Sequence, residues 1–147
     1  MKLKIPDQSP VLRYEHQLRS RFGETDKMGY VYYGHYLDYF EVARTEMIRE
    51  AGFPYTRLEK EGIILPVIYS QIAYHQPVFY DELMNIEVLV FEIPVVRLET
   101  YYRIFTERQE APHAEGQVTL CFTDAETRKP KRAPKDFVQF LEKSQHR

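Results

Sequence analysis

The feature that most constrains the fold is a change in the period of the apolar residues partway along the chain. Within residues 34–51, apolar side chains recur every three or four positions, at Tyr36, Phe40, Ala43, Met47 and Ala51. This spacing places them on one face of an α-helix. Gly52 follows directly, and glycine ends helices well because it adopts positive φ without a Cβ clash. The pattern therefore predicts one long amphipathic helix over residues 34–51.

After residue 62 the apolar period falls to two, which is typical of β-strands. These segments are rich in β-branched and aromatic residues, many of them at alternate positions. With one earlier segment of the same kind, the predicted strands cover residues 11–22, 64–78, 82–93, 96–108 and 114–124. Turn signals separate the later strands at residues 80–82, 93–95 and 109–113. Because short turns join antiparallel neighbours, we expect an antiparallel sheet.

Two shorter helices and an N-terminal arm complete the expected organisation. Residues 54–62 and 134–143 have helical patterns, whereas residues 1–10 contain two prolines and little periodicity, as in a flexible arm. A length of 147 residues fits one domain. An amphipathic sheet needs a cover for one face, and the long striped helix supplies it. The sequence predicts a single α+β domain over residues 1–147, in which a curved antiparallel sheet wraps around one long central helix.

Composition excludes several classes of function. A formal net charge of -2 gives no general attraction to nucleic acid or to an anionic membrane. No stretch approaches the ~20 apolar residues that cross a bilayer, and the N-terminus lacks the apolar segment of a signal peptide, so we expect a cytoplasmic protein without membrane insertion. Cys121 is the single cysteine, so no intrachain disulfide forms. The five histidines are scattered, none at the spacing of a helical zinc pair, which predicts no metal site.

Residues Glu24–Arg44 read ETDKMGYVYYGHYLDYFEVAR and form the most unusual stretch of the chain. Asp26 lies on a glycine-containing loop just before the predicted long helix. The start of a helix carries N–H groups without intrahelical partners and roughly half a positive charge, so it suits a developing oxyanion. The residues alone leave two roles for Asp26: catalysis, or capping of a turn, since Thr-Asp before glycine is common turn chemistry. Glu41 and Arg44 lie three positions apart on the helix, a spacing that allows an ion pair.

Three segments together resemble the hotdog-fold acyl-CoA thioesterases, in particular the family of 4-hydroxybenzoyl-CoA thioesterase and of the thioesterase associated with the Tol–Pal system. In the first, residues 24–53, the positions at the family's spacing are Asp26, Gly29, Val31, Tyr36, Phe40, Glu41 and Arg44. The second is YHQPVFYDEL, with Pro77, Tyr80, Asp81 and Leu83. The third is KPKRAPKDF, a proline-bracketed basic turn. The resemblance extends from about Leu12 to Phe140 and implies the hotdog fold.

The resemblance also implies an activity, the hydrolysis of an acyl-CoA thioester to the free acid and coenzyme A. Coenzyme A is then part of the substrate, and no other cofactor is expected. Asp26 would either attack the thioester carbonyl or activate a water molecule, and the choice between these stays open. The backbone N–H of Tyr33, at the start of the helix, would polarise the carbonyl oxygen. Gly29 and Gly34 are assigned to substrate binding beside these groups, Gly29 because glycine permits a tight loop or close approach of a ligand.

Two positions depart from the commonest form of the family's motif. Many relatives have histidine-glycine-asparagine where this chain has Tyr33-Gly34-His35. Backbone polarisation survives a tyrosine at the first position, since only the amide takes part. His35 is interpreted as a helix-start residue that donates a hydrogen bond or lines the acyl pocket, with a role as acid or base near Asp26 as the alternative. These changes affect the acyl preference, which the sequence leaves open.

The basic turn before the last predicted helix has two readings. It contains Arg128, Lys129, Lys131 and Arg132, which either hold the phosphates of coenzyme A or form a solvated charged loop. The same turn would suit an acidic acyl carrier protein, so an acyl carrier protein thioesterase is one alternative function. A non-catalytic acyl-CoA-binding module is another. The resemblance further implies a homodimer or homotetramer, in which subunits join through a sheet edge and active sites form between them.

Overall fold

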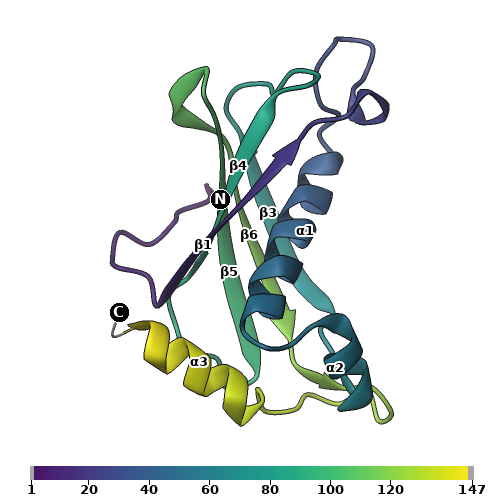
Figure 1. Cartoon of the computed structure of the whole chain (residues 1–147), viewed down its shortest axis with the longest axis vertical. Coiled ribbons are helices and arrows are strands. Elements are labelled where there is room, and N and C mark those ends of the chain that lie inside the picture. Colours follow the sequence, from purple (N-terminus) through teal and green to yellow (C-terminus); the bar gives the residue numbers. More distant parts are fainter. Residues whose placement is uncertain (1, 146–147) are drawn as a thin grey trace.

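The computed structural model describes residues 2–145 and confirms the predicted α+β organisation (Figure 1). In chain order the elements are β1 (Leu12–Arg19), the 3₁₀ turn η1 (Phe22–Glu24), α1 (His35–Glu50), α2 (Tyr55–Lys60), β2 (Ile63–Ile64), β3 (Val67–Tyr74), β4 (Leu83–Val90), β5 (Arg97–Thr106), β6 (Gln109–Cys121), β7 (Thr123–Asp124) and α3 (Lys135–Gln145). The long helix predicted over residues 34–51 is α1. It ends before Gly52, whose φ of 93° is the left-handed conformation that glycine allows.

Five strands form one antiparallel sheet in the order β1-β4-β5-β6-β3. β4, β5 and β6 are consecutive neighbours, as short connections predict. β3 precedes β4 in the chain but pairs with β6 at the opposite side of the sheet. Residues 75–82 must therefore cross one end of the sheet to reach β4. This crossing segment lies beside the loop before α1, because Val31 N–H donates to the carbonyl of Val78 at 2.8 Å.

α1 covers one face of the sheet and supplies much of the core (Figure 1). The predicted apolar face of the helix is buried at Tyr36, Phe40, Ala43 and Met47. The Phe40 ring is fully buried and stacks on Tyr102 of β5, with 4.4 Å between the ring centroids and 18° between the planes. Gly116 of β6 lies against the same ring, and a Cβ atom there would lie only 2.3 Å from a ring carbon of Phe40. The missing side chain at Gly116 thus lets α1 approach the sheet closely.

Two strand predictions are wrong in their bounds, and proline explains much of the difference. The predicted strand over residues 64–78 is interrupted at Pro66, which has no N–H to donate to a ladder. Ile63–Ile64 pair with β7 instead, and only Val67–Tyr74 join the large sheet. The predicted turn over residues 109–113 is the first part of β6, and the turn lies at Glu107–Arg108. Pro112 is tolerated there because the β5–β6 register shifts between Ile104 and Thr106.

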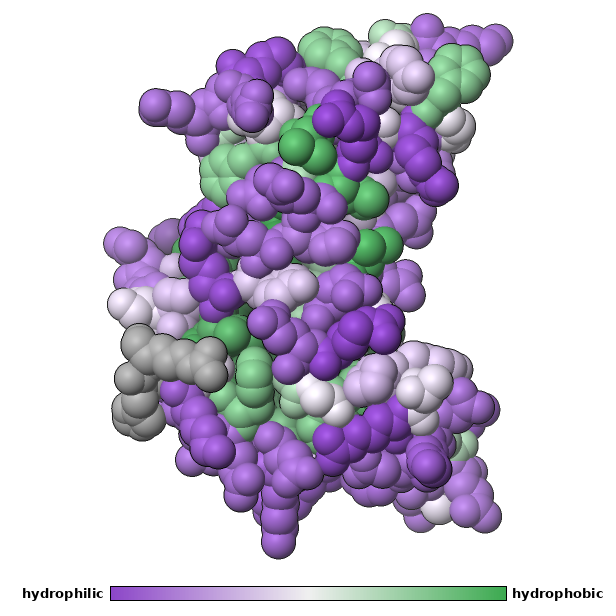
Figure 2. Space-filling model, viewed as in Figure 1, coloured by the Kyte–Doolittle hydropathy of each residue, from purple (hydrophilic) through white to green (hydrophobic). Residues whose placement is uncertain are grey.

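The remaining segments close the ends of the core. Phe137 of α3 is buried, with its ring edge-on to Phe53 at 5.9 Å between centroids. Residues 2–10 form no helix or strand, but Leu3 and Ile5 are partly buried, so this arm is not fully solvated. Figure 2 shows a mostly hydrophilic face, with hydrophobic side chains visible between the polar ones. None of the helices within residues 2–145 combines the length and apolarity needed to span a bilayer.

Candidate active site

The loop that carries Asp26 is a small closed hairpin between η1 and α1. Asp26 N–H donates to the carbonyl of Tyr30 at 2.9 Å, and Tyr32 N–H donates to the carbonyl of Glu24 at 2.9 Å. At the tip, Gly29 has a φ of 86°, a conformation in which a side chain is strained. Gly29 N–H donates to the carbonyl of Asp26 at 3.1 Å. The backbone therefore fixes the position of Asp26 relative to the start of the helix.

Glu24 attaches this hairpin to α1. Its carboxylate accepts hydrogen bonds from the hydroxyl of Tyr39 at 2.9 Å and from the N–H of Arg21 at 2.8 Å. Burial raises the pKa of Tyr39, and the hydrogen bond to Glu24 raises it further, so the phenol stays protonated and donates. Glu24 is thus a structural anchor of the loop that presents Asp26.

Asp26 and Tyr33 line the same cleft, which has a volume of about 380 Å³. The other lining residues are Met28, Tyr30, Val31, Tyr36, Tyr74, His75, Gln76 and Pro77. Oδ1 of Asp26 accepts a hydrogen bond from Met28 N–H at 2.8 Å, the turn interaction expected of an aspartate before glycine. Oδ2 accepts no hydrogen bond from residues 2–145. One carboxylate oxygen therefore orients the side chain, and the other is available for chemistry.

The backbone before α1 leaves donors unused. Within residues 2–145, the N–H groups of Tyr33 and Gly34 have no hydrogen-bond acceptor. The carbonyl of Tyr33, in contrast, accepts from the hydroxyl of Tyr74 at 3.2 Å and from Tyr36 N–H at 3.4 Å. An unpaired amide beside a helix N-terminus polarises a carbonyl oxygen placed against it. The cleft thus combines a carboxylate with a candidate oxyanion donor.

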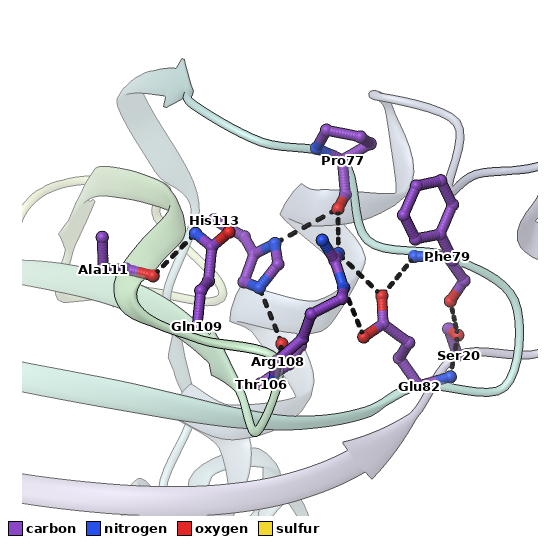
Figure 3. A network of polar contacts seen from close by, with 9 residues as sticks. All are labelled: Ser20, Pro77, Phe79, Glu82, Thr106, Arg108, Gln109, Ala111 and His113. Carbon is purple, nitrogen blue, oxygen red and sulfur yellow. Dashed lines mark hydrogen bonds and ion pairs between the residues drawn. The ribbon is translucent and has the colours of Figure 1, made fainter.

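The opposite wall of the cleft comes from the crossing segment between β3 and β4, and a polar network holds it (Figure 3). Arg108 forms hydrogen bonds to both carboxylate oxygens of Glu82, at 2.9 and 3.1 Å, and donates to the carbonyl of Pro77 at 2.7 Å. Glu82 in turn accepts from Phe79 N–H at 2.8 Å. The guanidinium lies 4.7 Å from the centroid of the Phe79 ring. Arg108 thus fixes the backbone of the wall at two points.

His113 supports the same wall from inside the core. It is fully buried, its Nε2 lies 2.7 Å from the hydroxyl of Thr106, and its Nδ1 lies 3.2 Å from the carbonyl of Pro77. Burial lowers the pKa of His113, so the ring is neutral, with Nδ1–H donating to Pro77 and Nε2 accepting from Thr106. The carbonyl of His113 accepts from the N–H groups of His75 and Gln76, at 2.9 and 3.1 Å.

The structure does not bring every predicted site residue to this cleft. Gly29 and Gly34 are not among its lining residues, although each is adjacent in the chain to a residue that is. His35 lies on another concave surface, with Arg21 and Tyr39, and its Nδ1 lies 3.0 Å from a carboxylate oxygen of Asp38. The interpretation of His35 as a residue of the Asp26 cleft therefore lacks structural support in one chain. In the described residues, no group of three or more histidine, cysteine or acidic side chains could hold a metal ion.

The basic turn lies at the far end of α1 from Asp26 (Figure 1). Arg128, Lys129, Lys131 and Arg132 are all exposed, and they lie between β7 and α3. The 16 residues of α1 span about 24 Å at 1.5 Å per residue. Within one chain these cations therefore do not contact the cleft.

Sequence reasoning missed the contribution of Tyr74, His75, Gln76 and Pro77 to the cleft. The signal was present, since the segment YHQPVFYDEL stood out by its family spacing. Its position opposite the Asp26 loop depends on β3 pairing with β6 and not with β4. That pairing is not encoded in the local pattern of apolar residues.

Comparisons with known proteins find similar chains among the thioesterases. The family model described as the thioesterase-like superfamily matches residues 20–141. A Bacillus subtilis protein described as the putative acyl-CoA thioesterase YneP is 32% identical over 114 residues, which cover 78% of this chain and 82% of the relative. The acyl-CoA thioester hydrolase YbgC of Escherichia coli is 27% identical over 121 residues, 82% of this chain and 90% of the relative. The structure of a DHNA-CoA thioesterase from Staphylococcus aureus superposes with a TM-score of 0.83, at 34% identity over 91% of each chain.

Proposed function

This chain belongs to the thioesterase-like superfamily and has its hotdog fold, and from that premise we propose that it hydrolyses acyl-CoA thioesters with Asp26 as the catalytic carboxylate. The observation that carries the proposal is the shared cleft of Asp26 and Tyr33. A carboxylate with a free oxygen lies on one side, and an unpaired backbone amide lies at the start of α1. These are the two groups that thioester hydrolysis requires, one to deliver the nucleophile and one to stabilise the oxyanion.

Asp26 performs this chemistry in one of two ways. As a nucleophile, its free oxygen attacks the thioester carbon, the C–S bond breaks, and coenzyme A leaves as a thiolate that takes a proton. Water then hydrolyses the mixed anhydride. As a general base, Asp26 removes a proton from a water molecule that attacks the same carbon. Both routes give the free acid and coenzyme A, and both need the Tyr33 amide to stabilise the tetrahedral oxyanion.

The walls of the cleft favour an aromatic acyl group. Tyr30, Tyr33, Tyr36 and Tyr74 contribute to the lining, and aromatic rings pack well against one another, edge-on or offset. The Staphylococcus aureus protein is named a DHNA-CoA thioesterase, and a relative from Synechococcus elongatus is named a 1,4-dihydroxy-2-naphthoyl-CoA hydrolase, which supports the same choice. We expect kcat/KM for benzoyl-CoA to exceed that for hexanoyl-CoA. Equal kcat/KM values for the two substrates would show that the tyrosines do not favour an aromatic acyl group.

We propose that two copies of the chain join along β3. This edge strand exposes Val67, Ile68 and Tyr69, and an exposed apolar edge recruits another strand. Antiparallel pairing about a two-fold axis sets the Tyr74 end of one strand against the Val67 end of its partner. The basic turn of one subunit then lies toward the cleft of the other, where Lys131 and Arg132 are available for the phosphates of coenzyme A. A homotetramer would arise from two such dimers.

The test of the proposal is a thiol-release assay on the wild type and on matched aspartate variants. Asp26→Asn keeps the shape of the side chain but removes its charge, and we expect kcat to fall by about 100-fold or more. Asp38→Asn, on an exposed side chain outside the cleft, is the control and retains wild-type activity. If Asp26→Asn turned over acyl-CoA within about twofold of the wild-type rate, Asp26 would not be the catalytic group.

The same assay separates the alternatives. Faster release from acyl carrier protein than from coenzyme A would favour the carrier protein thioesterase. Binding of acyl-CoA without release of thiol by the wild type would favour a binding module. The Lys131→Gln, Arg132→Gln double variant tests the phosphate contacts, because loss of ground-state binding raises KM and leaves kcat unchanged.

A further inference from the structure

A second cavity lies at the other end of α1. It has a volume of about 270 Å³ and lies between the C-terminal half of α1, the short helix α2 and the strand β2. Most of its wall is apolar, formed by Ile48, Phe53, Leu58, Ile63, Ile64, Leu65 and Leu120. No residue of this wall also lines the Asp26 cleft. The cavity is therefore a separate site within one chain.

One cation lies in this apolar cavity without an anionic partner. Arg44 of α1 lines the cavity, and only 7% of its surface is exposed. Its Nη1 donates to the hydroxyl of Tyr102 at 3.0 Å. No carboxylate of residues 2–145 forms an ion pair with it. The ion pair with Glu41 that the helical spacing allows is not formed, although Glu41 lies on the cavity rim.

A buried guanidinium without a carboxylate partner is unusual. Burial of a charge is costly unless the charge is paired, and a guanidinium has five N–H donors, of which a single neutral hydroxyl uses one. No side-chain nitrogen of the described residues is both sealed from solvent and unbonded. The unused donors of Arg44 are therefore accessible, and Arg44 is one of the residues that line this cavity. Planar, bidentate contact with a carboxylate is the interaction that a guanidinium makes best.

We propose that this cavity binds an organic monocarboxylate with an apolar body. The carboxylate pairs with Arg44, and the body packs on the apolar wall formed in part by Phe53 and Leu58. Glu41 and Glu59 also line the cavity and are exposed, so a second negative charge on the ligand meets repulsion at the rim. This selects a monoanion over a dianion. The free acid released by the proposed reaction has this chemistry, and in that respect alone the inference rests on the proposed function.

The test is calorimetric binding of benzoate and hexanoate to the intact protein, with benzamide and hexanamide as neutral matched probes. We expect both acids to bind the wild type more tightly than their amides, and adipate to bind more weakly than hexanoate. Arg44→Gln removes the cation and keeps hydrogen-bonding capacity, and it should weaken binding of the acids by about 10- to 100-fold, since hydrogen bonds to charged groups contribute about 1.5–3 kcal/mol. Arg49→Gln, an exposed arginine on the same helix, should leave binding unchanged.

Two further variants make the result decisive. Leu58→Trp fills the cavity from its apolar wall and leaves Arg44 in place, so it should abolish binding of both acids. This variant keeps the proposal testable if Arg44→Gln does not fold. Asp26→Asn should bind the acids as the wild type does, which separates this site from the proposed catalytic cleft. The proposal is overturned if the acids bind no better than the amides, or if Arg44→Gln or Leu58→Trp binds the acids with wild-type affinity. None of these outcomes depends on thioester hydrolysis.

Discussion

A methyl group added at Gly116 should measurably displace α1 from the sheet. Gly116 lies in β6, directly against the ring of Phe40. In Gly116→Ala the new Cβ atom would lie 2.3 and 2.7 Å from two ring carbons, far inside van der Waals contact. The ring cannot turn away freely, because it is fully buried and stacked on Tyr102 at 4.4 Å. The helix or the strand must therefore move.

The size of the effect follows from the packing. Overpacking a core by one methylene-sized group costs about 1–3 kcal/mol, and the buried, stacked ring places this site toward the upper end. Replacing glycine also lowers the conformational entropy of the unfolded chain, which stabilises the folded state by about 0.4–1 kcal/mol. We expect a net loss of about 2 kcal/mol for Gly116→Ala from these two terms. For a domain of this size that lowers Tm by roughly 4–8 °C.

Thermal unfolding followed by circular dichroism measures this shift. Gly23→Ala is the matched control, because a Cβ atom at Gly23 meets nothing within 4 Å, and its Tm should change by no more than about 2 °C. Adding Phe40→Leu to Gly116→Ala should cost less than the sum of the two single changes, since the smaller side chain relieves the clash. A Tm for Gly116→Ala equal to that of Gly23→Ala would refute the close contact between α1 and β6.

Three further predictions concern the walls of the Asp26 cleft. Arg108→Gln should lower kcat/KM by roughly tenfold with little change in Tm, because the Pro77 wall loses its anchor and small misplacements are costly in catalysis; wild-type kinetics would contradict this. Gly29→Ala should lower activity and stability together, since φ is 86° there and alanine is strained by about 1 kcal/mol or more; an unchanged Tm would count against the tight loop. Burial lowers the pKa of His113 from 6.5, so the unfolded chain binds a proton at this residue more readily than the folded chain does. The free energy of unfolding should therefore hold above about pH 6.5 and decline as the pH falls below it. In a series of Tm values measured against pH, His113→Asn should flatten this decline.

The local elements could be predicted from the sequence because their signals are local. The spacing of Tyr36, Phe40, Ala43 and Met47 specifies a helix and its buried face, and α1 follows it within one residue at each end. Errors arose where a long-range partner overrides the local pattern. Ile63 and Ile64 have strand character, but Pro66 separates them from β3, and β7 pairs with them instead.

The candidate site also combines residues that are close in sequence with residues that only the long-range topology brings together. The resemblance to the family pointed to Asp26 and Tyr33, and their proximity was predictable because they are close in sequence and lie on one loop before one helix. The wall at Pro77 and its support by Arg108 and His113 depend on the crossing of residues 75–82 over the sheet, which no local pattern encodes. Arg44 is the clearest case. Helical spacing allows an ion pair with Glu41, whereas burial of the helix face directs the guanidinium to Tyr102 of β5.

The most direct test of the central claim is a structure of the Asp26→Asn variant with a nonhydrolysable acyl-CoA analogue in which the thioester sulfur is replaced by a methylene group. We predict that the analogue's carbonyl oxygen lies about 2.7–3.1 Å from the backbone nitrogen of Tyr33, with the residue 26 side chain beside the carbonyl carbon. A carbonyl group bound away from both residues, with the Tyr33 amide still unpaired, would contradict it.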